Sequence, residues 1–278
     1  MASSLPRSSL GFSSSSALPF MRRHPVWRGV MPAYYWMEFY VDPRLGSAAS
    51  LVAETVRALL DAGCRYERVR LLTTQDTALD RMHQRVTREE RALDLQRAQE
   101  LATNSAARLE DSYPDAMLIF TYPFEFDPEV RAKISRHGDD LQEAVKEIHV
   151  GFGPVEDRRI GRRTRINVTM FHEFVLIYGR PETHERNMQR ILLIAESIYN
   201  HVKPYFGWMD DETNSSDMSY DRLLDGKFPL GNEIVFIGKS LVGTANLRDL
   251  NRLGHWNKML PDGGVVMRWA AKDRWDTE

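Results

Sequence analysis

Residues 171–209 carry the clearest alternation of strand-like and helix-like patterns in the chain. A strand is expected from Phe171 to Tyr178, and Gly179-Arg180-Pro181 ends it because proline cannot continue a β-ladder. A helix is expected from Glu182 to Val202, because apolar residues recur there at spacings of three and four. These apolar residues are Met188, Ile191, Leu192, Ala195, Ile198, Tyr199 and Val202. Pro204 ends the helix, and Tyr205–Met209 predicts a further strand, so this segment is expected to build the core.

The chain upstream of this segment predicts further strands and helices. The aromatic and β-branched run Tyr34–Val41 indicates a strand. Ser47 is expected to cap a helix that continues to Ala62 and stops at Gly63. Strands are then expected at Tyr66–Thr73 and Asp115–Tyr122, and a strand or a loop at Ile148–Pro154. Short helices are expected to begin at Pro128 and Asp139.

Residues 78–111 are charged, with few apolar positions. This composition predicts one or two partly exposed helices that project from the core. The run Arg85–Arg91 mixes both signs of charge, which favours a solvated helical face over a nucleic-acid contact.

The C-terminal part predicts a strand at Glu233–Ile237, a short helix at Asn246–Leu253 and a closing strand at Val265–Ala270. Pro261-Asp262-Gly263-Gly264 is a strong turn signal before that last strand. Without an internal repeat or a linker, the pattern predicts one α+β domain over residues 31–278. We expect a mixed or antiparallel sheet with helices packed on one face.

Residues 1–30 differ in composition from the rest of the chain. They hold eight serines, four arginines and no acidic residue. This is typical of an organelle transit peptide, but a plainer alternative is a start codon assigned too far upstream, with Met31 as the true first residue. We expect a disordered or spurious leader outside the fold.

Length and composition exclude several classes of protein. The 278 residues are 42% hydrophobic and 27% charged, with a net charge of -2, which is ordinary for a folded domain without a strong attraction to nucleic acid or membranes. No apolar run reaches the roughly 18 residues that a membrane span needs. The single cysteine, Cys64, fits a reducing compartment and a cytoplasmic protein. No cofactor is expected, and the sequence carries no signal for an oligomeric state.

Five arginines cluster around Gly161, where a β-hairpin turn is expected: Arg158, Arg159, Arg162, Arg163 and Arg165. Their guanidinium groups could bind phosphate or an acidic protein surface. The alternative is a charged hairpin that keeps a sheet edge soluble.

Asp210, Asp211 and Glu212 follow Trp208, and Asp217 lies further on. Clustered carboxylates are suitable ligands for a divalent cation, but the spacing lacks the glycine and the terminal glutamate of a calcium-binding loop. A solvated acidic loop is the alternative. The chain contains no HExxH pair, no Gly-x-Ser-x-Gly elbow and no phosphate loop.

The C-terminal third resembles a family of binding proteins. The resemblance rests on Val202-Lys203-Pro204-Tyr205-Phe206-Gly207-Trp208, on Ile237-Gly238 with Leu241, and on Leu260-Pro261-Asp262-Gly263-Gly264-Val265-Val266. This pattern is similar to the immunity-type domains found beside bacterial and archaeal polymorphic or type VI toxins. The resemblance implies a non-catalytic α+β protein of prokaryotic defence that blocks a partner protein by binding it.

Two hypotheses follow from the sequence. The first is a cytoplasmic binding protein that contacts its partner through Trp208, Asp210, Asp211 and Glu212 and through the hairpin of Arg158, Arg159, Arg162 and Arg163. The second is a metal-dependent or phosphate-handling enzyme that uses Asp210, Asp211, Glu212 and Asp217, joined by His201 and the arginines. The missing catalytic motifs favour the first.

Overall fold

A computed structural model describes most of the chain between Tyr34 and Arg268. The described residues are 34–75, 85–108, 116–136, 138–157, 161–171, 175, 180–211, 234–242 and 256–268. They form an α+β fold around one large sheet, as the hydrophobic pattern predicts. None of the described helices is both long and apolar enough to cross a membrane.

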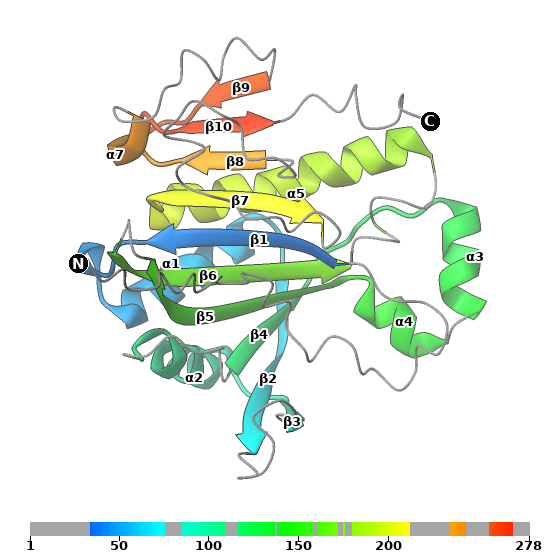
Figure 1. Cartoon of the computed structure of the whole chain (residues 1–278). Helices are drawn as coiled ribbons and strands as arrows, with labels where there is room; N and C mark the ends of the chain where they lie inside the picture. The colour runs from blue at the N-terminus through cyan, green and yellow to red at the C-terminus, as the bar shows by residue number, and fades with distance from the viewer. Residues whose placement is uncertain are drawn as a thin grey trace, which may run out of the picture.

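Ten described strands form a single sheet in which neighbouring strands run antiparallel (Figure 1). In spatial order they are β3 (Arg85–Arg91), β2 (Arg65–Gln75), β4 (Ala116–Thr121), β5 (Glu147–Asp157), β6 (Gly161–Phe171), β1 (Tyr34–Val41), β7 (Phe206–Asp211), β8 (Ile234–Ile237), β10 (Val265–Arg268) and β9 (Trp256–Met259). The first strand in sequence therefore lies in the middle of the sheet, between β6 and β7.

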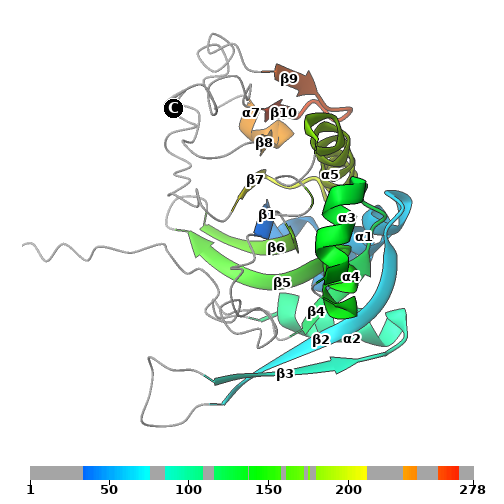
Figure 2. The ribbon, with the colours of Figure 1, turned by 90° about the vertical axis from the view of Figure 1, so that its right-hand side faces the viewer.

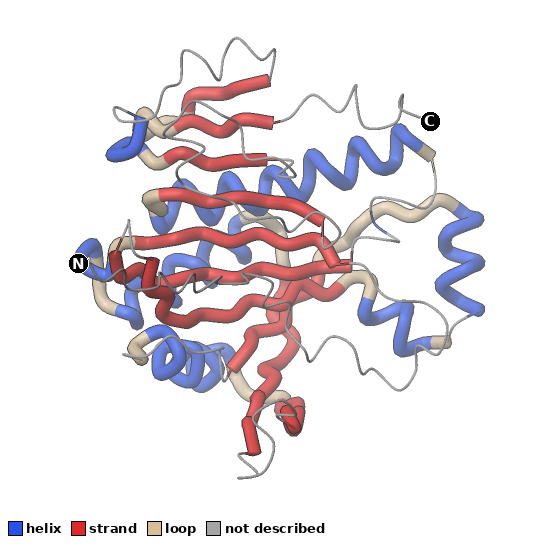
Figure 3. Tube along the Cα trace, in the orientation of Figure 1, coloured by secondary structure: helices blue, strands red, loops and turns tan. Residues whose placement is uncertain are grey.

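Three helices cover one face of this sheet (Figures 2 and 3). They are α1 (Ala48–Asp61), α2 (Leu95–Ala106) and α5 (Pro181–Val202). Helices α3 (Pro128–Arg136) and α4 (Asp139–Ala144) pack beside Trp36 and Phe171 at one end of the sheet. The short helix α7 (Lys239–Val242) follows β8, and a 3-10 turn at Pro43–Leu45 precedes α1.

Alternating residues of each strand belong to opposite sides of the sheet. On β1, Tyr35, Met37 and Phe39 are fully buried in the main core with α1 and α5. The Phe236 ring lies between the rings of Phe39 and Tyr199, with centroid distances of 5.4 and 5.9 Å. Trp36, Glu38 and Tyr40 belong to the other side, which we call the second face.

The structure confirms most of the expected elements. Ser47 caps α1, since its Oγ accepts a hydrogen bond from the Ser50 amide. β5 and β6 form the expected hairpin, and Gly161 at its turn has a φ of 68°, which favours glycine. The turn at Gly263, with a φ of 91°, joins β9 to β10. The expected helix at residues 246–253 lies outside the described residues, and β9 and α7 were not expected.

The prediction of helices over residues 78–111 is wrong for Arg85–Arg91, which forms strand β3. This segment is a strand because of a tertiary contact: Glu90 accepts hydrogen bonds from Arg68 and Arg70 of β2. Mixed charge on an edge strand also discourages pairing with other sheets. Among the described residues of this stretch, only α2, over Leu95–Ala106, is helical as expected.

The expected strand at Phe171–Tyr178 is also wrong in part. The strand in this region is β6, which begins at Gly161 and ends at Phe171. Val175 is not in a strand, and the remaining residues of the expected strand lie outside the described residues. Phe171 packs with α3 and α4 instead of starting a new element.

Candidate functional site

Strands β6, β1 and β7 bring distant residues together on the second face. Glu38 of β1 lies opposite Asn167 of β6 and Trp208 of β7. Two residues further along β1, Tyr40 lies opposite Arg165. The register thus places an acid, an amide, an arginine and two aromatic residues side by side.

Hydrogen bonds organise these residues around the buried carboxylate of Glu38. The Tyr40 hydroxyl donates to Oε2 at 2.5 Å, and the Asn167 amide donates to Oε1 at 3.1 Å. Arg165 Nη1 lies 3.8 Å from the same Oε1. Burial, together with the charge of Glu38, raises the pKa of Tyr40 well above its usual value, so its hydroxyl stays a hydrogen-bond donor at neutral pH.

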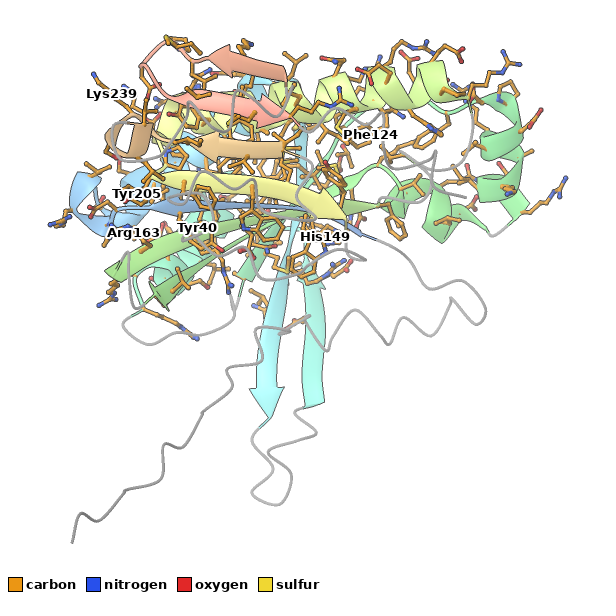
Figure 4. The ribbon with its side chains drawn as sticks, turned by 45° about the horizontal axis from the view of Figure 1, so that its top comes forward. Tyr40, Phe124, His149, Arg163, Tyr205 and Lys239 are labelled. Atoms are coloured by element: carbon orange, nitrogen blue, oxygen red, sulfur yellow. The ribbon has the colours of Figure 1, made fainter. Side chains whose placement is uncertain are left out.

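Further arginine and aromatic side chains extend this group toward the hairpin. Trp208 Nε1 lies 3.5 Å from the Tyr40 hydroxyl oxygen. The Arg163 guanidinium lies over the Tyr205 ring, 5.1 Å from its centroid, which is a cation–π contact. All five side chains are half-buried. We call Tyr40, Arg163, Arg165, Tyr205 and Trp208 the arginine–aromatic patch; Figure 4 shows Tyr40, Arg163 and Tyr205 together at one end of the strands.

The turn between α5 and β7 positions the aromatic half of this patch. Lys203 adopts a left-handed conformation with a φ of 47°, and Pro204 prevents the helix from continuing. The Tyr205 amide then donates to the Tyr40 carbonyl oxygen at 2.8 Å, which aligns β7 with β1. Gly207 has no side chain, and a Cβ there would lie 2.5 Å from Phe39 Cδ1, so glycine permits the close approach of these strands.

A second buried polar cluster joins β2, β3 and β5. Glu147 pairs with Arg68 and accepts a hydrogen bond from His149 Nε2 at 2.7 Å, and His149 Nδ1 accepts one from Arg70 at 3.3 Å. Burial raises the pKa of Glu147, but His149 and Arg68 outweigh it and lower the value to about 2. Both ring nitrogens of His149 are therefore engaged, and the cluster fits a structural role better than proton transfer. His149 lies away from the patch (Figure 4).

A pocket lies near the turn of the hairpin, on the helix side of the sheet. Its volume is about 340 Å³, within the usual range for a ligand-binding pocket. Residues of β1, α1, α2, β5, β6 and α5 and of the 3-10 turn line it, among them Asp42, Ser50, Glu54, Ala107, Arg162 and His201. The structure thus brings together His201 and Arg162, which are far apart in the sequence.

Asp210 and Asp211 do not lie in the expected acidic loop. Asp210 and Asp211 belong to β7, opposite Trp36 and Tyr35 of β1, because the pairing with β1 continues past Trp208. Glu212 and Asp217 lie outside the described residues, as do Arg158 and Arg159. Within the described part of the chain, no group of three or more His, Cys, Asp or Glu side chains could hold a metal ion.

Residue type alone identified Trp208, Arg162, Arg163 and Arg165, but Glu38 and Tyr40 were not singled out. The run Tyr34–Val41 predicts a strand but gives no signal for a binding site. The sequence around Glu38 and Tyr40 does not reveal that these residues pair with β6 and β7.

Cys64 is buried next to the end of α1. Burial raises the pKa of its thiol to about 12, so the thiol is protonated at neutral pH. A nucleophilic role for Cys64 is not supported.

No known protein family and no curated protein matches this sequence. A weak structural neighbour is the Pseudomonas aeruginosa T6SS protein PA0821, with a TM-score of 0.37 and 13% sequence identity. The similarity covers 85% of this chain and 64% of that protein. This chain therefore spans less than two thirds of the length of PA0821.

Proposed function

We propose that this protein binds another protein through the arginine–aromatic patch and blocks it without catalysis, in the manner of an immunity-type protein. The observation that supports this proposal is the composition and arrangement of the patch. Three aromatic and two arginine side chains, all half-buried, lie side by side on the second face. Tryptophan, tyrosine and arginine supply most of the binding energy in protein interfaces.

The hydrogen bonds beneath the patch support the same proposal. Glu38 holds Tyr40 and Arg165 in place before a partner arrives, so less side-chain freedom is lost on binding. The immunity-type resemblance of the C-terminal third includes Tyr205 and Trp208, which belong to this patch. The alternative of a metal-dependent enzyme has less support, because Asp210 and Asp211 lie in strand β7 and not in a loop.

The test is co-expression with each product of the neighbouring genes. We expect one product to be toxic alone, to lose its toxicity in the presence of this protein, and to co-purify with it. Trp208→Ala and Arg163→Ala should each weaken that complex by about 30-fold in Kd, the effect of losing an interface residue worth about 2 kcal/mol.

Arg97→Ala is the matched control for Arg163→Ala. Arg97 is an exposed arginine of α2 that pairs with Glu100, away from the patch. Thermal unfolding of each variant separates loss of binding from loss of fold. A partner that binds both patch variants as tightly as the parent protein would place its contact surface elsewhere and contradict the proposal.

A further inference from the structure

We infer that the second face contains a site for a carboxamide, the side-chain group of asparagine or glutamine, which a partner protein presents to Trp36, Asn167 and Thr169. This inference rests on the proposed function, since the site adjoins the arginine–aromatic patch. It adds the chemistry that the partner must present at this place.

Buried polar atoms without hydrogen-bond partners lie together on the second face. In the described part of the chain, four such side-chain atoms occur: Trp36 Nε1, Arg163 Nε, Asn167 Oδ1 and Thr169 Oγ1. Their residues belong to β1 or β6 and alternate with core residues along these strands, so they share one side of the sheet. An unpaired buried group costs folding free energy, so native proteins keep few of them. Their concentration on two paired strands therefore points to a ligand.

The strand register places three of these residues next to one another. Trp36 lies directly opposite Thr169, and Asn167 lies two residues before Thr169 on the same strand. Residues in such positions are about 5 to 7 Å apart, so one small ligand group can reach all three. Arg163 lies further along β6, over the Tyr205 ring, and belongs to the patch.

The hydrogen-bonding capacity of these three residues specifies the ligand. The Trp36 indole offers one N–H donor, whereas Asn167 offers an acceptor oxygen, since its Nδ2 already donates to Glu38. The Thr169 hydroxyl can donate or accept. A carboxamide presents an acceptor oxygen and an N–H donor side by side, so it can bond to Trp36 and Asn167 at once. The N–H and C=O of a trans backbone amide point in opposite directions, and a carboxylate has no donor for Asn167.

This carboxamide site continues the arginine–aromatic patch toward α3 and α4. Glu38 accepts hydrogen bonds from Tyr40 of the patch and from Asn167 of the site, so it links the two. Trp36 packs against the cluster that α3, α4 and Phe171 form at the end of the sheet. Glu38 and Trp36 are two residues apart on β1, or about 7 Å, so a partner that covers the patch can reach the site.

The free protein shields the three polar atoms from water. Asn167 is 7% exposed and Thr169 is fully buried, whereas Trp36 is half-buried. Entry of a carboxamide therefore requires the Trp36 ring to shift. The hydrogen bonds formed on binding offset the cost of this movement, because they satisfy groups that are unpaired in the free protein.

The first experiment measures the thermal unfolding of Thr169→Val. Valine has nearly the same shape and suits a strand, but it removes the unpaired hydroxyl. We expect the melting temperature to rise by about 2 to 4 °C. Thr55→Val is the matched control, because Thr55 is equally buried but its hydroxyl donates to the Leu51 carbonyl oxygen at 2.8 Å. The control should not gain stability. A Thr169→Val variant no more stable than the parent would mean that water satisfies this hydroxyl, and would overturn the inference.

The second experiment uses propionamide as the probe and propionate as the control without an N–H donor. NMR follows the indole N–H resonance of Trp36, which the Trp36→Phe variant assigns. We expect propionamide to shift this resonance in a saturable way and propionate to leave it unchanged. Thr169→Val should weaken propionamide binding by about fivefold, the effect of losing one neutral hydrogen bond, and Thr55→Val should not. An unchanged resonance, or an equal response to both probes, would contradict the inference.

The proposed function can fail separately. If a neighbouring product binds through the patch, and Thr169→Val binds it as tightly as the parent does, only the carboxamide inference is wrong. If no neighbouring product binds while propionamide binds in a Thr169-dependent way, only the proposed function loses its support.

Discussion

Asn187 of α5 shows how one side chain ties several segments together. Its Oδ1 accepts from the Glu125 amide at 2.9 Å, and its Nδ2 donates to the carbonyl oxygens of Glu125 and Val175 at 2.8 and 2.9 Å. The side chain is fully buried. Its role is to satisfy backbone groups that would otherwise be buried without partners.

We expect Asn187→Ala to lower the free energy of unfolding by about 2 to 4 kcal/mol, because it leaves these backbone groups unpaired. Urea unfolding followed by circular dichroism measures the change. Asn200→Ala, at an exposed position of the same helix, is the control and should change stability by less than about 0.5 kcal/mol. Similar losses in the two variants would show that the bonds of Asn187 contribute little.

The ionised carboxylate of Glu147 stabilises the folded state, and this contribution is lost in acid. Its folded pKa of about 2 lies below the ordinary value of 4.5, so the folded state binds this proton more weakly than the unfolded state. The stabilisation is therefore fully present above pH 4.5 and is lost as the pH falls from about 4.5 to about 2. Its size is on the order of 3 kcal/mol.

We expect Glu147→Gln to be less stable than the parent at pH 7 and to lose less further stability between pH 4.5 and pH 2. Urea unfolding at several pH values measures both effects. Glu143→Gln, at an exposed position of α4, should keep the pH dependence of the parent. A Glu147→Gln profile parallel to that of the parent would count against the assigned pKa.

At the scale of elements, the junction of β7 and β8 depends on a close backbone approach. A Cβ at Gly238 would lie 2.3 Å from the Pro204 carbonyl oxygen and 2.6 Å from that of Tyr205. The Gly238 amide also donates to Tyr205 at 3.0 Å. Backbone atoms cannot move aside as a side chain can, so only glycine fits here.

We expect Gly238→Ala to lower the free energy of unfolding by about 2 kcal/mol or more, the usual range for overpacking a fixed contact. Thermal unfolding provides the measurement. Gly46→Ala is the control, since its new Cβ would find its nearest neighbours in Ser50 at 3.8 Å. A Gly238→Ala variant as stable as Gly46→Ala would mean that the strands adjust freely.

Whether the sequence predicts an element depends on whether local residues or distant partners determine it. α5 follows from local periodicity, because its buried apolar residues pack into the main core, and β1 follows from its aromatic and β-branched run. β3 does not, because its partners are Arg68 and Arg70 of a different strand. Asp210 is extended for a similar reason, since its strand continues through pairing with β1.

In the candidate site too, some residues are predictable from the local sequence and others depend on long-range pairing. Trp208 and the hairpin arginines stand out by residue type, so the sequence singles them out. Their union with Tyr40 and Glu38, and the meeting of Arg162 with His201 in the pocket, arise from strand register and helix packing. Such long-range pairings leave no trace in local spacing.

At the scale of the whole molecule, the two sides of the sheet carry different kinds of side chain. α1, α2 and α5 bury one side and provide the main core. The second face carries half-buried arginine and aromatic side chains, supported by buried hydrogen bonds. Under the proposed function, this division would let the arginine–aromatic patch change in sequence with little effect on the main core.

The central place of β1 also has a consequence for synthesis on the ribosome. β1 leaves the exit tunnel first among the described strands, yet both of its neighbours, β6 and β7, are translated much later. Until Asp211 has emerged, β1 lacks its final pairing with β7. The nascent chain therefore exposes an unpaired apolar strand that is prone to aggregation. Translation pauses upstream of β7 should therefore favour capture of the growing chain by chaperones.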